Sequence, residues 1–466
     1  MVPRRLLSVC ITVLLLAASL SAAACGSAAP GPTTSSSASA SASQTSGSNP
    51  VAPPNGSAPG GQPGGAGGST QQFTPTGKYS QQGGTATEAN ATYSASAADQ
   101  SAVLVSAGGS LTLADVTIQT SGDSKSLDES SFYGLNAGVL AESGAKIVVS
   151  GGSVATSGTG ANGVFAYGSG SSITMFDATI KATAQGGHGA MASGGGSMTL
   201  KDVDIDTAGA NSAPIATDRG GGTITVSGGT ILSSGADSPG IYSTGSITVT
   251  GARVTATGSE AVVIEGSNSV SLSDTTLSGT KKRGVMIYQS MSGDAQGAKG
   301  IFTMTGGSLA VAAGPLFYVT NSTGIITVRG VALTAASGTL IAAGAGDCGT
   351  GGSNGGTVRF TAGAEKLKGD VLSDSISSIS LTLKHGTTLR GKIDKAGLTL
   401  DASSKWIVTA DSTLTSLTDA SGISGSSITN IVGNGHNVSY DSSLAANSSL
   451  GGKTYALVNG GQLIPK

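Results

Sequence analysis

From about residue 100 onward, apolar and polar residues alternate in short runs separated by corners rich in Gly and Asp. A typical unit is Ile224-Thr-Val226 followed by Ser-Gly-Gly-Thr-Ile231, and the same arrangement returns at Ile247-Thr-Val249. Alternation with a period of two predicts β-strands with one face toward a core. No segment with a helical period competes with these runs, so the pattern predicts an all-β chain.

The unit returns at a nearly fixed spacing, with a minimum of about 23 residues and occasional insertions, which is typical of a solenoid. Each period also contains a later strand such as Gly240-Ile-Tyr-Ser-Thr244, which makes three short strands per coil. We therefore predict a single-domain right-handed parallel β-helix of about 12–13 coils. Its first apolar positions are Leu111, Ile147, Ile173, Met198, Ile224, Ile247, Val270, Phe302, Ile326, Val358, Leu381 and Leu398.

The N-terminus has a different pattern. Arg4 and Arg5 precede an apolar run that ends in small residues before Cys25. This organisation predicts a signal peptide over residues 1–24 rather than a membrane-spanning helix. The sequence Ala22-Ala23-Ala24-Cys25-Gly26 resembles a bacterial lipobox, and that resemblance implies that Cys25 becomes the lipidated first residue. An ordinary signal peptide cut near Ala24 is the alternative.

Composition then separates a linker from the folded part. Residues 25–85 are mostly Ser, Ala, Gly, Pro and Gln, and such a tract buries too little apolar surface to fold. We interpret it as a disordered tether, followed by the β-helix over 86–405 and by closing coils and a cap over 406–466.

The net charge of −2 and the scarcity of clustered Lys and Arg argue against nucleic acid as a partner. With Cys10 removed and Cys25 lipidated, Cys348 is left alone, and no intramolecular disulfide is expected.

Alternation along the later strands predicts which residues point away from the core. Scarce aromatics, carboxylates and guanidiniums gather at these outward positions, and aromatic rings with polar neighbours suit sugar rings and hydroxyls. This strip is our candidate glycan-binding surface, and the alternative is that long insertions cover it. Its members are Phe165, Tyr167, Asp218, Arg219, Tyr242, Glu265, Arg283 and Tyr288.

The first strand of each unit presents hydroxyls instead, such as Thr223, Thr225 and Ser227. Thr favours the strand conformation, and neighbouring Thr side chains stabilise paired strands. We prefer this structural interpretation to the alternative, in which the hydroxyls form a regular lattice that binds ice or a crystalline polysaccharide. Phe176, Lys201 and Arg329 interrupt the rows.

Evidence for catalysis is weak. Asp177 and Asp202 recur at equivalent corners, where Asp is ordinary turn chemistry. Glu265 and Asp218 are roughly 10 Å apart by stacking, which is marginal for a glycosidase pair. No His or Cys spacing predicts a metal site, although calcium is left open. We therefore predict no catalytic residues and no cofactor. The sequence favours a protein that is not an enzyme.

Several segments together resemble adhesin-like right-handed β-helix proteins of bacterial surfaces, within the pectin-lyase-like superfamily. The resemblance covers residues from about 100 to 466. It implies a fold and a surface address but no reaction. We expect a lipid-anchored cell-surface protein that binds glycan or cell-wall polysaccharide without cleaving it. A β-helix polysaccharide lyase or glycoside hydrolase and a passive structural rod are the alternatives. The segments are Ser131-Phe-Tyr-Gly-Leu-Asn-Ala-Gly-Val-Leu140, Gly160-Ala-Asn-Gly-Val-Phe-Ala-Tyr167, Asp218-Arg-Gly-Gly-Gly222, Ser259-Glu-Ala-Val-Val-Ile-Glu265, Tyr288-Gln-Ser-Met-Ser-Gly-Asp294 and Trp406-Ile-Val-Thr-Ala-Asp-Ser-Thr-Leu-Thr-Ser-Leu417.

Overall fold

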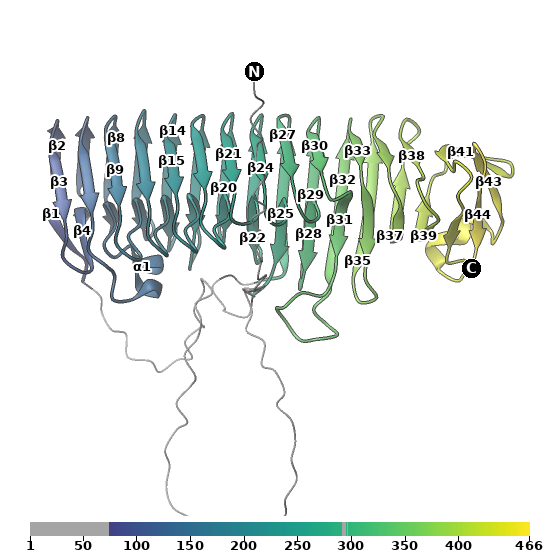
Figure 1. Cartoon of the computed structure of the whole chain (residues 1–466), viewed down its shortest axis with the longest axis horizontal. Coiled ribbons are helices and arrows are strands. Elements are labelled where there is room, and N and C mark those ends of the chain that lie inside the picture. Colours follow the sequence, from purple (N-terminus) through teal and green to yellow (C-terminus); the bar gives the residue numbers. More distant parts are fainter. Residues whose placement is uncertain (1–73, 291–294, 296) are drawn as a thin grey trace, which may run out of the picture.

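The computed structural model describes residues 74–290, 295 and 297–466. The predicted signal peptide, Cys25 and most of the predicted tether lie outside these residues. The described chain is one elongated stack of short strands, nearly all paired in parallel (Figure 1). The stack has about 15 turns, more than the 12–13 predicted. The coil before Leu111 was missed because its inward positions include the charged Glu88 as well as Ala86. Further strands follow Leu398, the last predicted position, up to Pro465.

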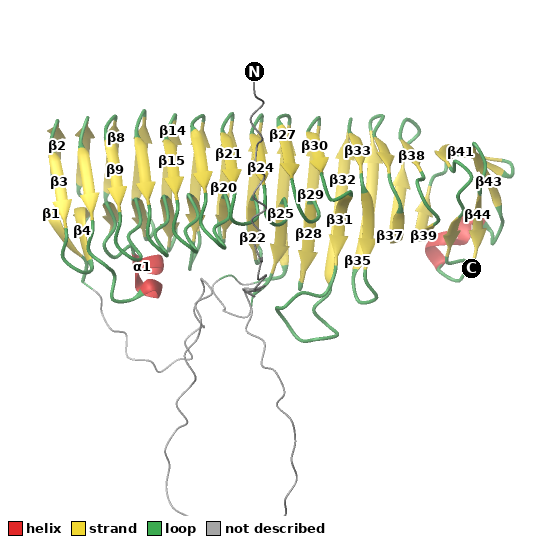
Figure 2. Ribbon diagram, viewed as in Figure 1, coloured by secondary structure: helices red, strands yellow, loops and turns green. Residues whose placement is uncertain are grey.

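Each coil contributes a leading, a middle and a trailing strand, and each kind stacks on its equivalents in the neighbouring coils (Figure 2). The leading strands are β1 (Thr76–Gln82), β4 (Gln100–Ser106), β7 (Val139–Glu142), β10 (Val164–Tyr167), β13 (Ala190–Ser193), β16 (Ile215–Thr217), β19 (Ile241–Ser243), β22 (Val262–Glu265), β25 (Val285–Tyr288), β28 (Phe317–Thr320), β31 (Thr339–Ala343) and β34 (Asp370–Ser373).

The middle strands are β2 (Thr85–Ala89), β5 (Ser110–Ala114), β8 (Lys146–Ser150), β11 (Ser172–Phe176), β14 (Gly196–Lys201), β17 (Gly222–Ser227), β20 (Ser246–Thr250), β23 (Ser269–Ser273), β26 (Lys299–Thr305), β29 (Ser322–Arg329), β32 (Gly356–Gly363) and β35 (Ser378–Lys384). The trailing strands are β3 (Thr92–Ala95), β6 (Thr117–Thr120), β9 (Ser153–Thr156), β12 (Thr179–Ala182), β15 (Asp204–Thr207), β18 (Thr230–Ser233), β21 (Arg253–Ala256), β24 (Thr276–Gly279), β27 (Ser308–Val311), β30 (Ala332–Ala335), β33 (Lys366–Lys368) and β36 (Thr388–Arg390).

The folded region begins about ten residues before the predicted boundary at residue 86, because β1 starts at Thr76. The boundary was placed too late because β1 is rich in Ser and Gln and contains few apolar residues. Its stability comes from backbone pairing with β4, in which Tyr79 lies opposite Val103.

Strict register builds the core. Ile224 lies opposite Ile247, and Ile247 lies opposite Val270 in the next coil. These side chains are at most 1% exposed and belong to one continuous apolar core along the rod. Inward positions of all three strand types contribute to it, as the alternation predicts.

The corner between middle and trailing strands requires a left-handed backbone, which Gly, Asn and Asp tolerate best. Asp177 and Asp202 occupy this corner with φ of 53° and 51°. In the next coil, a Cβ on Gly228 would lie 2.1 Å from the Asp202 Oδ1, so that glycine is required. The recurring Asp residues therefore serve as turn residues.

The C-terminal end closes the rod with altered pairing. A long strand, β37 (Ile393–Leu400), pairs with both β34 and β35. The final strand pair is antiparallel, and a short 3-10 helix, η1 (Ala445–Leu450), packs near it. Tyr440 and Trp406 are fully buried in this end of the core. The remaining strands are β38 (Lys405–Ile407), β39 (Ser412–Thr418), β40 (Ile423–Ser424), β41 (Ser427–Val432), β42 (Val438–Tyr440), β43 (Tyr455–Val458) and β44 (Gln462–Pro465).

Candidate functional site

The predicted glycan strip does lie on the outward face of the leading strands, outside the central core. However, a second buried cluster forms there, because other segments of the chain cover the strip. We call this buried cluster the covered strip. Its apolar members include Leu104, Leu140, Phe165, Met191, Ala216, Tyr242, Val263, Tyr288 and Cys348.

A short helix covers the N-terminal half of the strip. Helix α1 (Leu127–Tyr133) is an insertion between β6 and β7, capped by Ser126, whose side chain accepts a hydrogen bond from the Glu129 N–H. It lies beside the first coils in Figure 1. The helix ends at Gly134, where a Cβ would lie 2.6 Å from the Phe165 ring. The Ser193 hydroxyl donates to the Phe132 carbonyl at 2.6 Å, which fixes the helix end to the stack.

A buried carboxylate lies in the C-terminal half of the strip. The Glu265 Oε2 accepts hydrogen bonds from the Tyr242 hydroxyl at 2.6 Å and from the Tyr288 hydroxyl at 2.8 Å. The Ser290 hydroxyl donates to the other Glu265 oxygen. Three hydroxyl donors from neighbouring turns thus satisfy one carboxylate that is fully buried.

The same burial sets the protonation of the two tyrosines. Desolvation, followed by the neighbouring Glu265 charge, holds the pKa of Tyr242 and of Tyr288 well above the ordinary value of 10. Both phenols therefore keep their protons and serve as hydrogen-bond donors. This arrangement is suited to fixing the strip rather than to exchanging protons with a substrate.

The prediction that this strip is exposed is wrong for five of its eight residues. Phe165, Asp218, Tyr242, Glu265 and Tyr288 are all buried, with exposed fractions from 0% to 7%. Alternation correctly placed them outside the core, but it carries no information about an insertion that folds back over the sheet. The Asp218 carboxylate, for example, accepts a hydrogen bond from Ser131 of α1 at 2.7 Å.

The other three predicted residues are partly exposed and lie at the margins of the covered strip. Tyr167 contacts Tyr133 of α1 edge to face, with ring centroids 5.3 Å apart. The Arg219 guanidinium lies over the Phe132 ring at 3.8 Å, so it also secures the helix. Only Arg283 lies in a distinct charged surface cluster.

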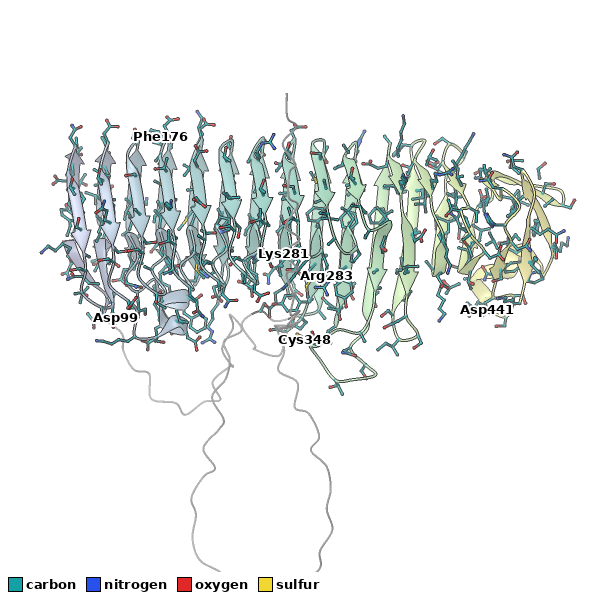
Figure 3. All side chains as sticks on the ribbon, in the orientation of Figure 1. Asp99, Phe176, Lys281, Arg283, Cys348 and Asp441 are labelled. Atoms are coloured by element: carbon teal, nitrogen blue, oxygen red, sulfur yellow. The ribbon has the colours of Figure 1, made fainter. Side chains whose placement is uncertain are left out.

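This cluster, which we call the basic–aromatic patch, consists of Asp237, Glu260, Lys282, Arg283 and Tyr318. The Arg283 Nη1 donates to the Glu260 Oε1 at 3.0 Å, and its guanidinium carbon lies 4.3 Å from the centre of the Tyr318 ring. Lys282 forms an ion pair with Asp237. In Figure 3 Arg283 lies nearer to the edge of the rod that bears Cys348 than to the edge that bears Phe176.

Sequence reasoning missed Tyr318, although the signal was present. Tyr318 lies opposite Met286 in the register of β28 on β25, and it therefore continues the second outward column by one coil. The Arg283 side chain is 35% exposed, while its partner Glu260 is 6% exposed. The patch thus joins an accessible cation to a buried carboxylate that orients it.

A shallow groove of about 280 Å³ lies on the trailing face near the N-terminal end. It is lined by small residues and one Gln from four successive coils, with Lys181 at one side, and Ala95 and Ala155 contribute methyl groups. The lining side chains include Ser94, Ser96, Gln119, Ser121, Ser157 and Thr183. Since these residues are polar and small, the groove offers hydrogen bonds but no aromatic platform.

Cys348 is buried in the covered strip and is disulfide-bonded. The expectation of a lone Cys348 is therefore wrong for the full-length chain. For a chain that has lost residues 1–24 and carries lipid on Cys25, the absence of an intramolecular disulfide stays a prediction. The chain's other cysteines, Cys10 and Cys25, lie outside the described residues.

Two further findings concern ions and membranes. Over residues 74–290, 295 and 297–466, no group of three or more His, Cys, Asp or Glu side chains is placed to hold a metal ion. In that same part of the chain, no helix has the length and apolar character needed to cross a membrane.

Comparison with known proteins supports the fold. The chain matches the family model described as right handed beta helix region, over residues 101–296 and, in an overlapping second match, 162–332. Together with the parallel coils described above, this match shows a right-handed parallel β-helix protein. More particularly, the chain has the pectin-lyase-like fold. No curated protein matches the sequence.

Proposed function

We propose that this protein is a cell-surface lipoprotein that binds a glycan or cell-wall polysaccharide without cleaving it. The right-handed β-helix fold is consistent with proteins that bind polysaccharides and with pectate-lyase-like proteins. Fold does not define function, so the proposal depends on the accessible chemistry of the surface.

The basic–aromatic patch is the observation that supports it. Arg283 is held between the Glu260 carboxylate and the Tyr318 ring, so its planar fork of N–H donors is oriented before a ligand arrives. Such a fork suits the hydroxyl and carboxylate oxygens of a glycan. Lys281 adds positive charge beside it, whereas the charge of Lys282 is balanced by Asp237. The charge of Lys281 favours a glycan that bears acidic groups.

A non-catalytic role is supported by the burial of the three carboxylates that lie along the covered strip and its margin. Asp218, Glu260 and Glu265 are at most 4% exposed. A glycosidase needs two carboxyl groups on either side of the scissile bond, within reach of the sugar. The buried positions of these residues argue against such a pair.

The extracytoplasmic address and the membrane partner come from the N-terminal sequence. The segment before Cys25 has the organisation of a secretory signal peptide. A lipid on Cys25 would anchor the protein to a membrane, with the rod outside it.

The test uses the mature chain on a panel of neutral and acidic polysaccharides. The double variant Arg283→Ala, Tyr318→Ala should bind at least about tenfold more weakly, because it removes both the donor fork and its aromatic support. Arg253→Ala, on the trailing face, is the matched control and should bind as the wild type does. Circular dichroism should show the same fold in all three proteins.

Three results would contradict the proposal. New reducing ends or unsaturated sugars would show an enzyme. A folded wild-type protein that binds no polysaccharide would favour a passive rod. Equal loss of binding in the Arg253→Ala control would place the contact elsewhere.

A further inference from the structure

One outward column on the middle face consists almost entirely of threonine. The central outward residue of each middle strand lies opposite its equivalent in the next coil, from β2 to β37, and we call this column the threonine file. Eleven of its thirteen positions are Thr. In order, the file is Thr87, Thr112, Val148, Thr174, Thr199, Thr225, Thr248, Ser271, Thr303, Thr327, Thr361, Thr382 and Thr399.

Thr is concentrated in this one column of the middle strands. The file runs through the strand centres, where strand propensity also favours Thr, and the flanking columns are mostly the first and last strand residues. The two columns that flank the file contain only four Thr among the same paired strands, namely Thr85, Thr223, Thr250 and Thr305. The flanking columns instead hold varied residues, and Phe176, Lys201 and Arg329 belong to one of them. The interruptions expected from sequence therefore lie beside the file and not in it.

The hydroxyls of the file are also not used within the protein. Across the described residues, none of them makes a hydrogen bond to another protein group. Hydroxyls at the corner after the trailing strands behave differently, because they donate to carbonyls of the preceding coil. Ser234 donates to the Thr207 carbonyl at 3.2 Å, and Thr280 donates to the Thr257 carbonyl at 3.0 Å. The file thus presents free hydroxyls and methyls to the outside.

The most exposed section of the file lies in an uncharged area. Strands β17, β20 and β23 present nine outward hydroxyl-bearing residues in three aligned rows, and none of the nine is ionisable. Rows are ~4.8 Å apart between coils and ~7 Å apart along a strand, and the whole file extends over roughly 58 Å. Their members are Thr223, Thr225, Ser227, Ser246, Thr248, Thr250, Ser269, Ser271 and Ser273.

We propose that the threonine file binds the ordered surface of an insoluble, uncharged polysaccharide. A periodic and straight surface with an uncharged section over β17, β20 and β23 complements a partner that is itself periodic and neutral. Alternating hydroxyls and methyls match the hydroxyl edges and C–H faces of packed sugar chains. This face is separate from the basic–aromatic patch, and its proposed ligand is a solid rather than a single charged chain.

The test measures binding of the mature chain to microcrystalline cellulose and to chitin powder. The triple variant Thr199→Val, Thr225→Val, Thr248→Val keeps β-branched side chains and removes only the hydroxyls. It should bind at least about tenfold more weakly. The matched control is Thr230→Val, Thr255→Val, Thr276→Val, which makes the same change on the trailing face and should bind as the wild type does. The Arg283→Ala, Tyr318→Ala variant should also retain binding to the solids, which separates this proposal from the preceding one.

Unchanged binding in the Thr199, Thr225, Thr248 variant, with its fold intact, would overturn the proposal. So would failure of the wild-type protein to bind either solid. Inhibition of ice growth by a wild-type protein that binds no polysaccharide solid would replace the proposed partner with ice.

Discussion

At the scale of single residues, buried polar side chains connect one coil to the next. The Asn162 Oδ1 accepts a hydrogen bond from the His188 N–H at 2.9 Å, and the His188 Nδ1 accepts one from the Ala213 N–H at 3.0 Å. His188 therefore repeats, one coil later, the role of Asn162. Because the imidazole is buried, its pKa falls from 6.5 to about 4.

This shift predicts a pH-dependent stability. Between pH 6.5 and 4 the unfolded chain binds a proton that the folded chain excludes, so the free energy of unfolding falls as the pH drops through this window. The contribution is complete above pH 6.5, and about 3 kcal/mol is lost by pH 4. Urea unfolding at several pH values measures it. His188→Asn keeps the acceptor and should remove this part of the pH dependence, and an unchanged slope in that variant would contradict the assignment.

At the scale of elements, helix α1 determines which side chains of the leading face are accessible. Without it, Phe165 and Met191 would lie on an open aromatic and apolar surface, as the sequence suggested. With it, they belong to a second core. The helix is short, and its contacts with the stack include its end at Gly134, Arg219 over Phe132 and the Ser131 hydroxyl on Asp218. Docking of this one element therefore conceals part of the predicted binding strip.

Gly134→Ala should release the helix. Gly134 has a φ of 76°, and an added Cβ would lie 2.6 Å from the Phe165 ring. Gly144→Ala is the matched control, since Gly144 has a φ of 78° but open space around it. We expect Gly134→Ala to weaken the docking of α1 on the stack by about 2 kcal/mol more than Gly144→Ala does. Hydrogen exchange over residues 121–137 measures this, and equal protection in both variants would show that the Phe165 contact is unimportant.

At the scale of the whole molecule, the rod is a stack in which each coil contacts its neighbours. Its long straight faces have different chemistry. The leading face has a covered strip with a charged margin, and the middle face has the threonine file. A tether and lipid at the N-terminus would hold these faces away from a membrane.

The anchor is tested at Cys25. Cys25→Ala should move the protein from the membrane fraction to the soluble fraction, whereas Cys10→Ser should leave it anchored. Mass spectrometry of the mature N-terminus should show acyl chains on Cys25 that survive reduction. Because one sulfur cannot carry a lipid and also be bonded to Cys348, a reducible Cys25–Cys348 pair without lipid would contradict the prediction.

The sequence by itself determined the repeat, the three strands per coil, the inward residues and the Asp and Gly corners. All of these follow from local rules: side-chain alternation and the left-handed backbone at a turn. It also identified Arg283 as a candidate glycan-binding residue.

Only the tertiary structure decided which outward residues are accessible. Residues 121–137 fold back over Phe165, and hydroxyls from neighbouring turns surround Glu265. Register across thirteen strands likewise aligned the threonine file, whose members are far apart in the sequence. Exposure and alignment depend on contacts between distant segments, and alternation within one strand contains no information about them.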